Sequence, residues 1–233
     1  MARLGDLKSR KAVIETCLAM NASGINQGTS GNVSLRGGKG FLITASGVSY
    51  DAMTPDQVVE MDLDGGYYGE WAPSSEWRMH LDIYRSRPEA QAIVHTHSTH
   101  ATALSCLRKD IPSFHYMIAV SGGGDLRCAD YATFGSKELS ENMLRALEGR
   151  KACLLANHGT ICFGPTLAKA LWLAGEVEAL CHQYFLACQA GEPVLLDSAE
   201  MARVLEKFST YGKQDAAALA KAQAAGEAPV KRG

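Results

Sequence analysis

The chain has 233 residues, of which 46% are hydrophobic and 21% charged, with a formal net charge of −2. This size and composition are typical of one globular domain, and the charge offers no electrostatic basis for binding nucleic acid or an anionic membrane. No apolar run approaches the ~18 residues of a membrane span, and the N-terminal segment lacks a signal-peptide core. The seven cysteines lack C-x-x-C spacing, which indicates reduced thiols, so we expect a cytoplasmic protein without nucleic-acid or membrane partners.

The first third of the chain predicts one helix followed by two hairpins. Apolar residues from Leu4 to Met20 recur at helical spacing, and Gly24 can end that helix in the left-handed conformation. A turn rich in glycine leads into the first strand, and Gly37-Gly38 is typical of a hairpin turn. The expected strands cover residues 32–36, 41–44, 58–63 and 67–70.

The rest of the chain alternates helices with short apolar strands. Pro73–Glu76 is expected to open a helix, because proline, serine and glutamate all suit a helix start. Further helices are expected over residues 98–107, 136–147, 166–189 and 198–208. Further strands are expected over residues 92–97, 152–156 and 161–163, and the apolar segment 111–120 also favours β structure.

This order of elements predicts a mixed α/β (α+β) fold, a three-layer α/β/α arrangement with a central, largely antiparallel sheet. Residues 1–213 are expected to form one catalytic domain. The Ala/Lys-rich segment 214–233 has no clear apolar face and is expected to be a disordered tail.

Histidines at the predicted strand ends indicate a metal site. His95 and His97 are two apart and share one face of an extended strand, and His158 also follows an apolar strand directly. Each could instead be an ordinary hydrogen-bonded histidine, and Glu76 a first-turn partner of the helix dipole. Three protein ligands plus one exchangeable position are nevertheless the usual form of a catalytic zinc site, and Glu76 could be a fourth, labile ligand or a catalytic carboxylate. Glu76, His95, His97 and His158 are therefore the candidate ligands. His80 falls on a predicted helix and is expected to be an ordinary partly buried residue.

Small polar residues in three turns suit an anion. They offer backbone N–H groups and short polar side chains, and those before the helix at residue 76 would also meet the positive end of its dipole. The alternative is that they are turns and an N-cap only. No Walker A or G-x-G-x-x-G pattern is present, which argues against a nucleotide. The candidate anion-binding residues are Gly31, Asn32, Ser46, Gly47, Ser74 and Ser75.

Several motifs together resemble one known family. The segments are T-S-G-N-V-S, L-I-T-A-S-G, P-S-S-E-W-R-M-H, I-V-H-T-H-S-T-H, I-P-S-F-H-Y-M-I-A, Y-A-T-F-G-S-K-E-L-S, N-H-G and L-E-K-F-S-T-Y-G. From about Arg10 to Gly212 the chain resembles the class II aldolase/adducin family, and within it most closely the L-fuculose-1-phosphate aldolase group.

The resemblance implies a role for each matching position. His95, His97 and His158 match ligands of Zn²⁺, and Glu76 matches a glutamate that both binds the metal and acts as acid/base. The six small polar residues match a phosphate site, although Ser46 stands where the fuculose enzyme has threonine. Residues at the aldehyde end, some contributed across the interface of a C4 homotetramer, match Tyr116, Phe134, Phe208 and Tyr211, and the two tyrosines are candidate proton-exchanging residues.

The implied activity is zinc-dependent cleavage of a ketose 1-phosphate to dihydroxyacetone phosphate and an aldehyde. L-Fuculose 1-phosphate and 5-deoxy- or 5-methylthioribulose 1-phosphate stay open as substrates. One alternative is an L-ribulose-5-phosphate 4-epimerase, although such epimerases carry aspartate where Glu76 stands. The other is a non-catalytic module like the adducin head, which does not keep the ligand set.

Overall fold

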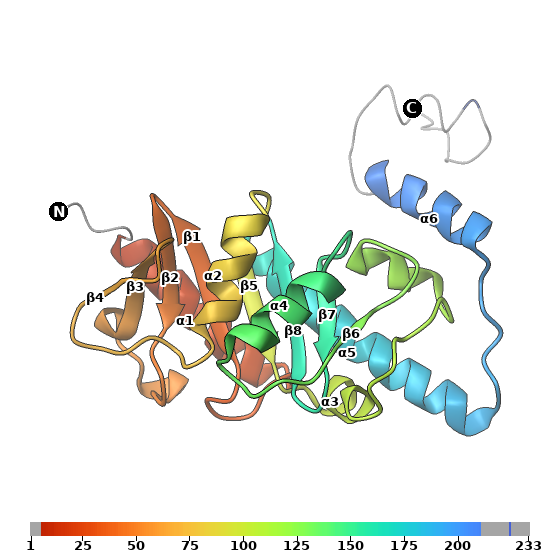
Figure 1. Cartoon of the computed structure of the whole chain (residues 1–233), viewed down its shortest axis with the longest axis horizontal. Helices are drawn as coiled ribbons and strands as arrows, with labels where there is room; N and C mark the ends of the chain where they lie inside the picture. The colour runs from red at the N-terminus through yellow and green to blue at the C-terminus, as the bar shows by residue number, and fades with distance from the viewer. Residues whose placement is uncertain (1–5, 211–223, 225–233) are drawn as a thin grey trace, which may run out of the picture.

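The computed structural model describes residues 6–210 and residue 224, and its centre is an eight-stranded sheet in the described part of the chain (Figure 1). The strands are β1 Asn32–Gly37, β2 Gly40–Thr44, β3 Val58–Asp62, β4 Tyr67–Tyr68, β5 Ala92–Thr96, β6 Cys128–Ala129, β7 Ala152–Leu155 and β8 Gly159–Gly164. Their spatial order is β4-β3-β2-β1-β5-β8-β7-β6. Neighbours are antiparallel except for the parallel pair β6 and β7.

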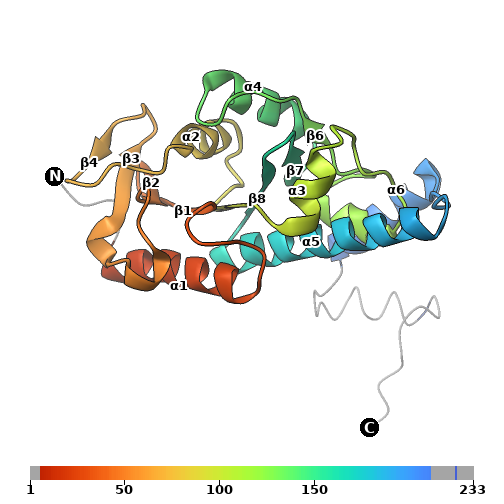
Figure 2. The ribbon, with the colours of Figure 1, turned by 90° about the horizontal axis from the view of Figure 1, so that it is seen from below.

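Helices cover both faces of this sheet (Figure 2). The α-helices are α1 Leu7–Ala22, α2 Trp77–Ser86, α3 Thr99–Ser105, α4 Lys137–Ala146, α5 Leu167–Ala190 and α6 Ser198–Thr210. Helices α1 and α5 lie along one face, and α2 and α4 lie on the other. The predicted three-layer α/β/α architecture with a largely antiparallel sheet is therefore confirmed.

Two hydrophobic cores lie between the layers, one on each face of the sheet. Successive residues of a strand pack into one core and then the other. On β5, Ala92 and Val94 pack into the core beneath α1 and α5, whereas Ile93 packs into the core beneath α2 and α4. Successive strand residues point to opposite faces of a sheet. His95 therefore belongs with Ile93 on the α2 side, which is also the side on which Glu76 precedes α2.

Helix α2 starts directly after the predicted segment Pro73–Glu76, with Glu76 rather than a serine as its N-cap. The Ser74 hydroxyl accepts the backbone N–H of Glu76, and the Trp77 N–H bonds the Ser74 carbonyl, so the chain turns into the helix at these residues. Burial of Met79 and Ile83 then holds α2 against the sheet. This start places Glu76 in a buried position next to the ends of β1 and β5, the two central strands of the sheet.

The expectation of β structure over residues 111–120 is wrong. Only Ile111 makes a ladder contact, an isolated bridge to Leu126, and Tyr116–Ser121 forms the 3₁₀ helix η3. The ring of His115 accepts the N–H of Met117 at the start of η3, and Gly122 ends it with a φ of 103°. Apolar character alone did not separate this buried short helix from a strand.

The prediction for residues 214–233 falls, apart from residue 224, outside the described residues, as does Tyr211. Among the described helices, none combines the length and the apolar character that crossing a membrane requires.

Candidate active site

The three strand-end histidines meet because β5 and β8 are antiparallel neighbours. Thr96 at the end of β5 pairs with Thr160 at the start of β8, so the residues just outside the two strands are adjacent. Between β7 and β8 the chain turns through Asn157, whose φ is 54°. Asparagine tolerates this left-handed conformation better than most residues.

Gly159 allows this close approach of the two strands. A Cβ atom at Gly159 would stand 2.4 Å from the carbonyl oxygen of Thr96 and 3.1 Å from the His97 ring. Each residue of the Asn-His-Gly sequence therefore has its own part in this geometry. Asn157 makes the turn, His158 carries the imidazole, and Gly159 leaves room for β5.

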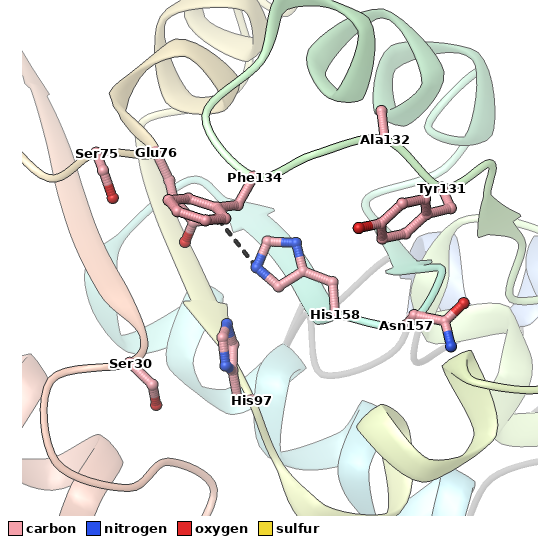
Figure 3. Close-up of a pocket in the computed structure, with 9 residues that line it drawn as sticks. All are labelled: Ser30, Ser75, Glu76, His97, Tyr131, Ala132, Phe134, Asn157 and His158. Atoms are coloured by element: carbon pink, nitrogen blue, oxygen red, sulfur yellow. Dashed lines mark ion pairs between the residues drawn. The ribbon is translucent and has the colours of Figure 1, made fainter.

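Four potential ligands face one point. One ligand atom from each of Glu76, His95, His97 and His158 lies within 4.8 Å of all the others. The carboxylate of Glu76 bridges two imidazoles, with Oε2 2.9 Å from Nε2 of His95 and Oε1 2.9 Å from Nε2 of His158; the second contact is dashed in Figure 3. The three rings stand nearly perpendicular to one another, with centroids 4.8–4.9 Å apart.

A backbone contact orients the innermost imidazole. Nδ1 of His95 lies 2.9 Å from the carbonyl oxygen of Thr160 and donates its proton to it, which leaves Nε2 directed at the cluster. Hydrogen bonds of this kind fix the tautomer and direction of metal-binding histidines. Three imidazole nitrogens with one carboxylate also form a donor set suited to a divalent ion, so these residues fit a metal ion.

Burial and charge act against each other on these groups. Burial alone would raise the pKa of Glu76, but the charges and hydrogen bonds of His95 and His158 outweigh it and hold that pKa well below its usual value. Burial lowers and the Glu76 carboxylate raises the pKa of His95, with a net rise. Burial, reinforced by the two neighbouring imidazoles, lowers the pKa of His97 to about 4. His97 therefore stays neutral at physiological pH, the form that binds metals.

The candidate anion-binding residues lie at the same end of the sheet as the four potential ligands. Asn32 begins β1 opposite His95, and the loop after β2, which holds Ser46 and Gly47, lies beside the segment before α2. A bridge between Ala45 and Pro73 joins that loop to the segment, as do bonds from the Ser46 N–H to the Ala72 carbonyl and from the Ser74 N–H to the Thr44 carbonyl.

Gly31 is enclosed, because a Cβ atom there would stand 2.4 Å from the His95 carbonyl oxygen. A substituent at this position would push β1 away from β5 at the point where Asn32 and His95 pair. The side chain of Asn32 points at Glu76, with Nδ2 3.1 Å from Oε2.

A cavity of about 260 Å³ opens over the potential ligands (Figure 3). Ser75 and Glu76 lie on one side of His158, and Tyr131 and Asn157 lie on the other. The complete lining is Ser30, Ser75, Glu76, His97, Tyr131, Ala132, Phe134, Asn157 and His158. Phe134, expected at the aldehyde end, is in the lining with 66% of its surface exposed.

Two tyrosines differ in their position relative to this cavity. Tyr116 is half exposed and faces Phe208, with ring centroids 6.3 Å apart, and it does not line the cavity of its own chain. Tyr131 lines the cavity although the sequence did not single it out, and its place in the Y-A-T-F segment with Phe134 was the available signal.

His80 was expected to be partly buried and ordinary, and that expectation is wrong. It is fully buried, and Nε2 lies 2.5 Å from Oδ1 of Asn32. The available signal was spacing, because His80 follows Glu76 by four residues and a helix places such residues on one face.

Comparison with known proteins agrees with this geometry. A family model described as the class II aldolase and adducin N-terminal domain matches residues 11–185. A 5-methylthioribulose-1-phosphate/5-deoxyribulose-1-phosphate aldolase of Rhodospirillum rubrum is 50% identical over 203 residues, 87% of this chain and 92% of the relative. An L-fuculose phosphate aldolase of Escherichia coli K12 is 50% identical over 206 residues, 88% of this chain and 96% of the relative.

A solved structure of an L-fuculose 1-phosphate aldolase superposes with a TM-score of 0.87 at 40% identity, covering 90% of this chain and all of that one. Sequence, fold and the cluster of imidazoles and carboxylate all lead to the same assignment. The chain belongs to the class II aldolase and adducin family.

Proposed function

We propose that this chain is a zinc-dependent aldolase that cleaves a ketose 1-phosphate between C3 and C4, giving dihydroxyacetone phosphate and an aldehyde. The observation that carries the proposal is the position of the Glu76 carboxylate among three imidazoles at the base of an open cavity. The named activities of the relatives support it, because those proteins are aldolases of fuculose phosphate and of 5-methylthio- or 5-deoxyribulose 1-phosphate. Binding of a sugar phosphate in the cytoplasm is part of the same proposal.

The proposed metal ligands are His95, His97 and His158, with Glu76 as the exchangeable fourth. Zn²⁺ held there would supply Lewis-acid chemistry, polarising the ketone of the substrate and stabilising the negative charge that develops on its oxygens. The chain itself orients the His95 imidazole through the bond from its Nδ1 to the Thr160 carbonyl.

Glu76 is proposed to move the proton at C3. Its lowered pKa keeps the carboxylate ionised, which is the form that removes a proton from dihydroxyacetone phosphate in the condensation direction. In cleavage the same group returns that proton to the enediolate formed when the C3–C4 bond breaks. The side-chain NH₂ group of Asn32 bonds Oε2, so the carboxylate is held in place for the transfer.

Phosphate is proposed to bind between the turns that carry Gly31, Asn32, Ser46, Gly47, Ser74 and Ser75. Ser75 lines the cavity directly beside Glu76. In dihydroxyacetone phosphate only two carbons separate the phosphate oxygen from the carbon that loses the proton. A phosphate anchor directly next to the acid/base suits this short fragment.

The aldehyde fragment is proposed to leave over Phe134, and Tyr116 or Tyr211 to exchange the proton of the C4 hydroxyl. Tyr116 does not line the cavity of its own chain, so this role requires a neighbouring subunit. A cyclic homotetramer, in which each site receives side chains from the next subunit, is therefore part of the proposal.

The direct test is to incubate the zinc-loaded protein with L-fuculose 1-phosphate, 5-deoxyribulose 1-phosphate, 5-methylthioribulose 1-phosphate and L-ribulose 5-phosphate and to follow products by NMR. Free dihydroxyacetone phosphate from any of the 1-phosphates is the expected result. Conversion of L-ribulose 5-phosphate to its C4 epimer without cleavage of the 1-phosphates would show an epimerase instead. No reaction with any of them, despite bound metal, would overturn the proposal.

A further inference from the structure

A ladder of buried polar side chains runs from Tyr84, near the C-terminal end of α2, to the carboxylate of Glu76. Tyr84 OH lies 2.8 Å from Ser34 Oγ, Ser34 Oγ lies 2.6 Å from His80 Nδ1, and His80 Nε2 lies 2.5 Å from Asn32 Oδ1. Nδ2 of Asn32 then lies 3.1 Å from Glu76 Oε2. Each of the five residues is at most 5% exposed, so solvent does not replace these contacts.

The ladder exists because two periodicities match. Glu76, His80 and Tyr84 follow one another at intervals of four and share one face of the helix. Asn32 and Ser34 are two apart on β1 and share one face of the sheet. Four helical residues rise about 6 Å and two strand residues about 6.6 Å, so the two rows interdigitate without a mismatch.

The hydrogen bonds of the ladder have one consistent direction. The Glu76 carboxylate only accepts, so Asn32 must turn its NH₂ group toward Glu76 and its carbonyl oxygen toward His80. His80 Nε2 must then carry the proton. Burial and the nearby His95 lower the pKa of His80 to about 3, so the ring is neutral and Nδ1 is an acceptor.

The remaining proton positions follow in the same way. The Ser34 hydroxyl donates to His80 Nδ1, and the Tyr84 hydroxyl donates to Ser34. The guanidinium of Arg36 stands over the Tyr84 ring, 4.6 Å from its centre, and bonds the Tyr84 carbonyl. The far end of the ladder is thereby held in place.

We propose that His80 and Ser34 are positioning residues: they hold the side-chain amide of Asn32 with its NH₂ group toward Glu76 and so keep the carboxylate aimed for proton transfer. Neither residue lines the cavity. Loss of the Ser34 hydroxyl would allow the His80 proton to move to Nδ1. Nε2 would then accept, Asn32 would turn over, and its carbonyl oxygen would face the carboxylate of Glu76.

The first test does not depend on activity. In the metal-free full chain at pH 7, ¹⁵N imidazole spectra should contain the signal of a neutral ring with its proton on Nε2 that disappears in His80→Gln. In Ser34→Ala this ring should shift toward the Nδ1–H form. A wild-type His80 that is protonated on Nδ1, or on both nitrogens, would overturn the proposal.

The second test is kinetic and depends on the proposed aldolase activity. With zinc bound, Ser34→Ala should lower kcat about tenfold and His80→Leu about 100-fold, with KM changed less than about threefold, because the substrate still binds but Glu76 is misaligned. His80→Gln should recover about tenfold over His80→Leu, since its amide can both donate to Asn32 and accept from Ser34. Ser140→Ala is the matched control, because it removes a buried serine that bonds Asp82 on the same helix, at 2.8 Å.

The outcomes separate the two proposals. If wild-type protein cleaves no ketose 1-phosphate, the proposed function fails. The imidazole spectra then still test the predicted proton positions of the ladder, because they do not depend on activity. If His80→Leu fails to fold, the turnover of Ser34→Ala and the imidazole spectra test the positioning role instead. Turnover of Ser34→Ala equal to that of Ser140→Ala, or a loss of turnover that follows loss of bound zinc, would overturn the positioning role.

Discussion

Nε2 of His95 lies 3.0 Å from Nε2 of His97. Two imidazole nitrogens at this separation share at most one proton, and burial lowers the pKa of His97 to about 4. A divalent cation satisfies both lone pairs better than a proton does, and its binding stabilises the folded state by mass action.

Zinc should therefore raise the melting temperature of metal-free protein. At a free concentration 100 times Kd the expected stabilisation is ~2.7 kcal/mol, which is several degrees for a chain of this size. Bound zinc should be about one ion per chain, and His97→Ala should lose both the zinc and the thermal shift. His182→Ala, on the exposed face of α5, should keep both, and equal zinc content in the two variants would contradict this assignment.

Replacement of Glu76 should affect turnover far more than binding. Gln keeps the size of the side chain and an oxygen for the Asn32 amide, but it does not exchange a proton. Glu76→Gln should lower kcat by at least ~100-fold, measured as dihydroxyacetone phosphate release in protein matched for bound zinc. A zinc-loaded variant with near-normal kcat would remove Glu76 from the mechanism.

Weakening the proposed phosphate site should raise KM for the substrate. Removing the hydroxyl of Ser75, which lines the cavity beside Glu76, should raise KM for a ketose 1-phosphate about tenfold, the expected cost of one hydrogen bond to a charged group. The control is Ser86→Ala at the other end of α2, where the hydroxyl bonds the Asp82 carbonyl. An unchanged KM in Ser75→Ala, with inorganic phosphate still inhibiting equally, would place the phosphate elsewhere.

Mixing inactive variants tests the shared site. If Glu76 acts with Tyr116 of a neighbouring subunit, exchange between Glu76→Gln and Tyr116→Phe tetramers should restore about a quarter of the activity per site, because random assembly pairs two intact residues at that frequency. Mixing Glu76→Gln with the double variant should restore none. Light scattering that shows a fully active monomer would exclude the shared site.

A partly buried carboxylate on α5, which faces the start of α3, predicts a pH-dependent contribution to stability. Glu178 accepts the N–H groups of His100 and Ala101, each at 2.9 Å. Burial raises its pKa, but these hydrogen bonds outweigh burial and lower it below 4.5. A lowered folded-state pKa gives stability that is complete above the unfolded value and is lost as pH falls through the folded value.

Glu178→Gln should therefore destabilise the protein by ~1–2 kcal/mol at pH 7, a typical effect of a helix cap. The difference from wild type in denaturant unfolding should narrow below pH 4.5. Glu176→Gln, two residues earlier on α5, serves as the control. A Glu178→Gln difference that stays constant down to pH 3 would contradict the capping role.

Local patterns in the sequence predicted much of this molecule. The apolar residues before His95 marked a short buried strand, and the spacing of His95 and His97 placed both rings on one face, because the period of a strand is two. The helix start at Pro73–Glu76 and the position of His158 directly after an apolar strand were also predicted from short segments. Backbone geometry constrains such short segments whatever surrounds them.

Tertiary structure decided what lies between segments distant in the chain. Glu76 and His158 are 82 positions apart, and only the pairing of β5 with β8 and the packing of α2 on the sheet bring Oε1 within 2.9 Å of Nε2. In the sequence His80 was one histidine on a predicted helix, and only the tertiary structure shows that Asn32 and Ser34 of β1 contact it. Side-chain contacts of this kind depend on the register between elements, which the packing of both cores sets together and which no single segment encodes.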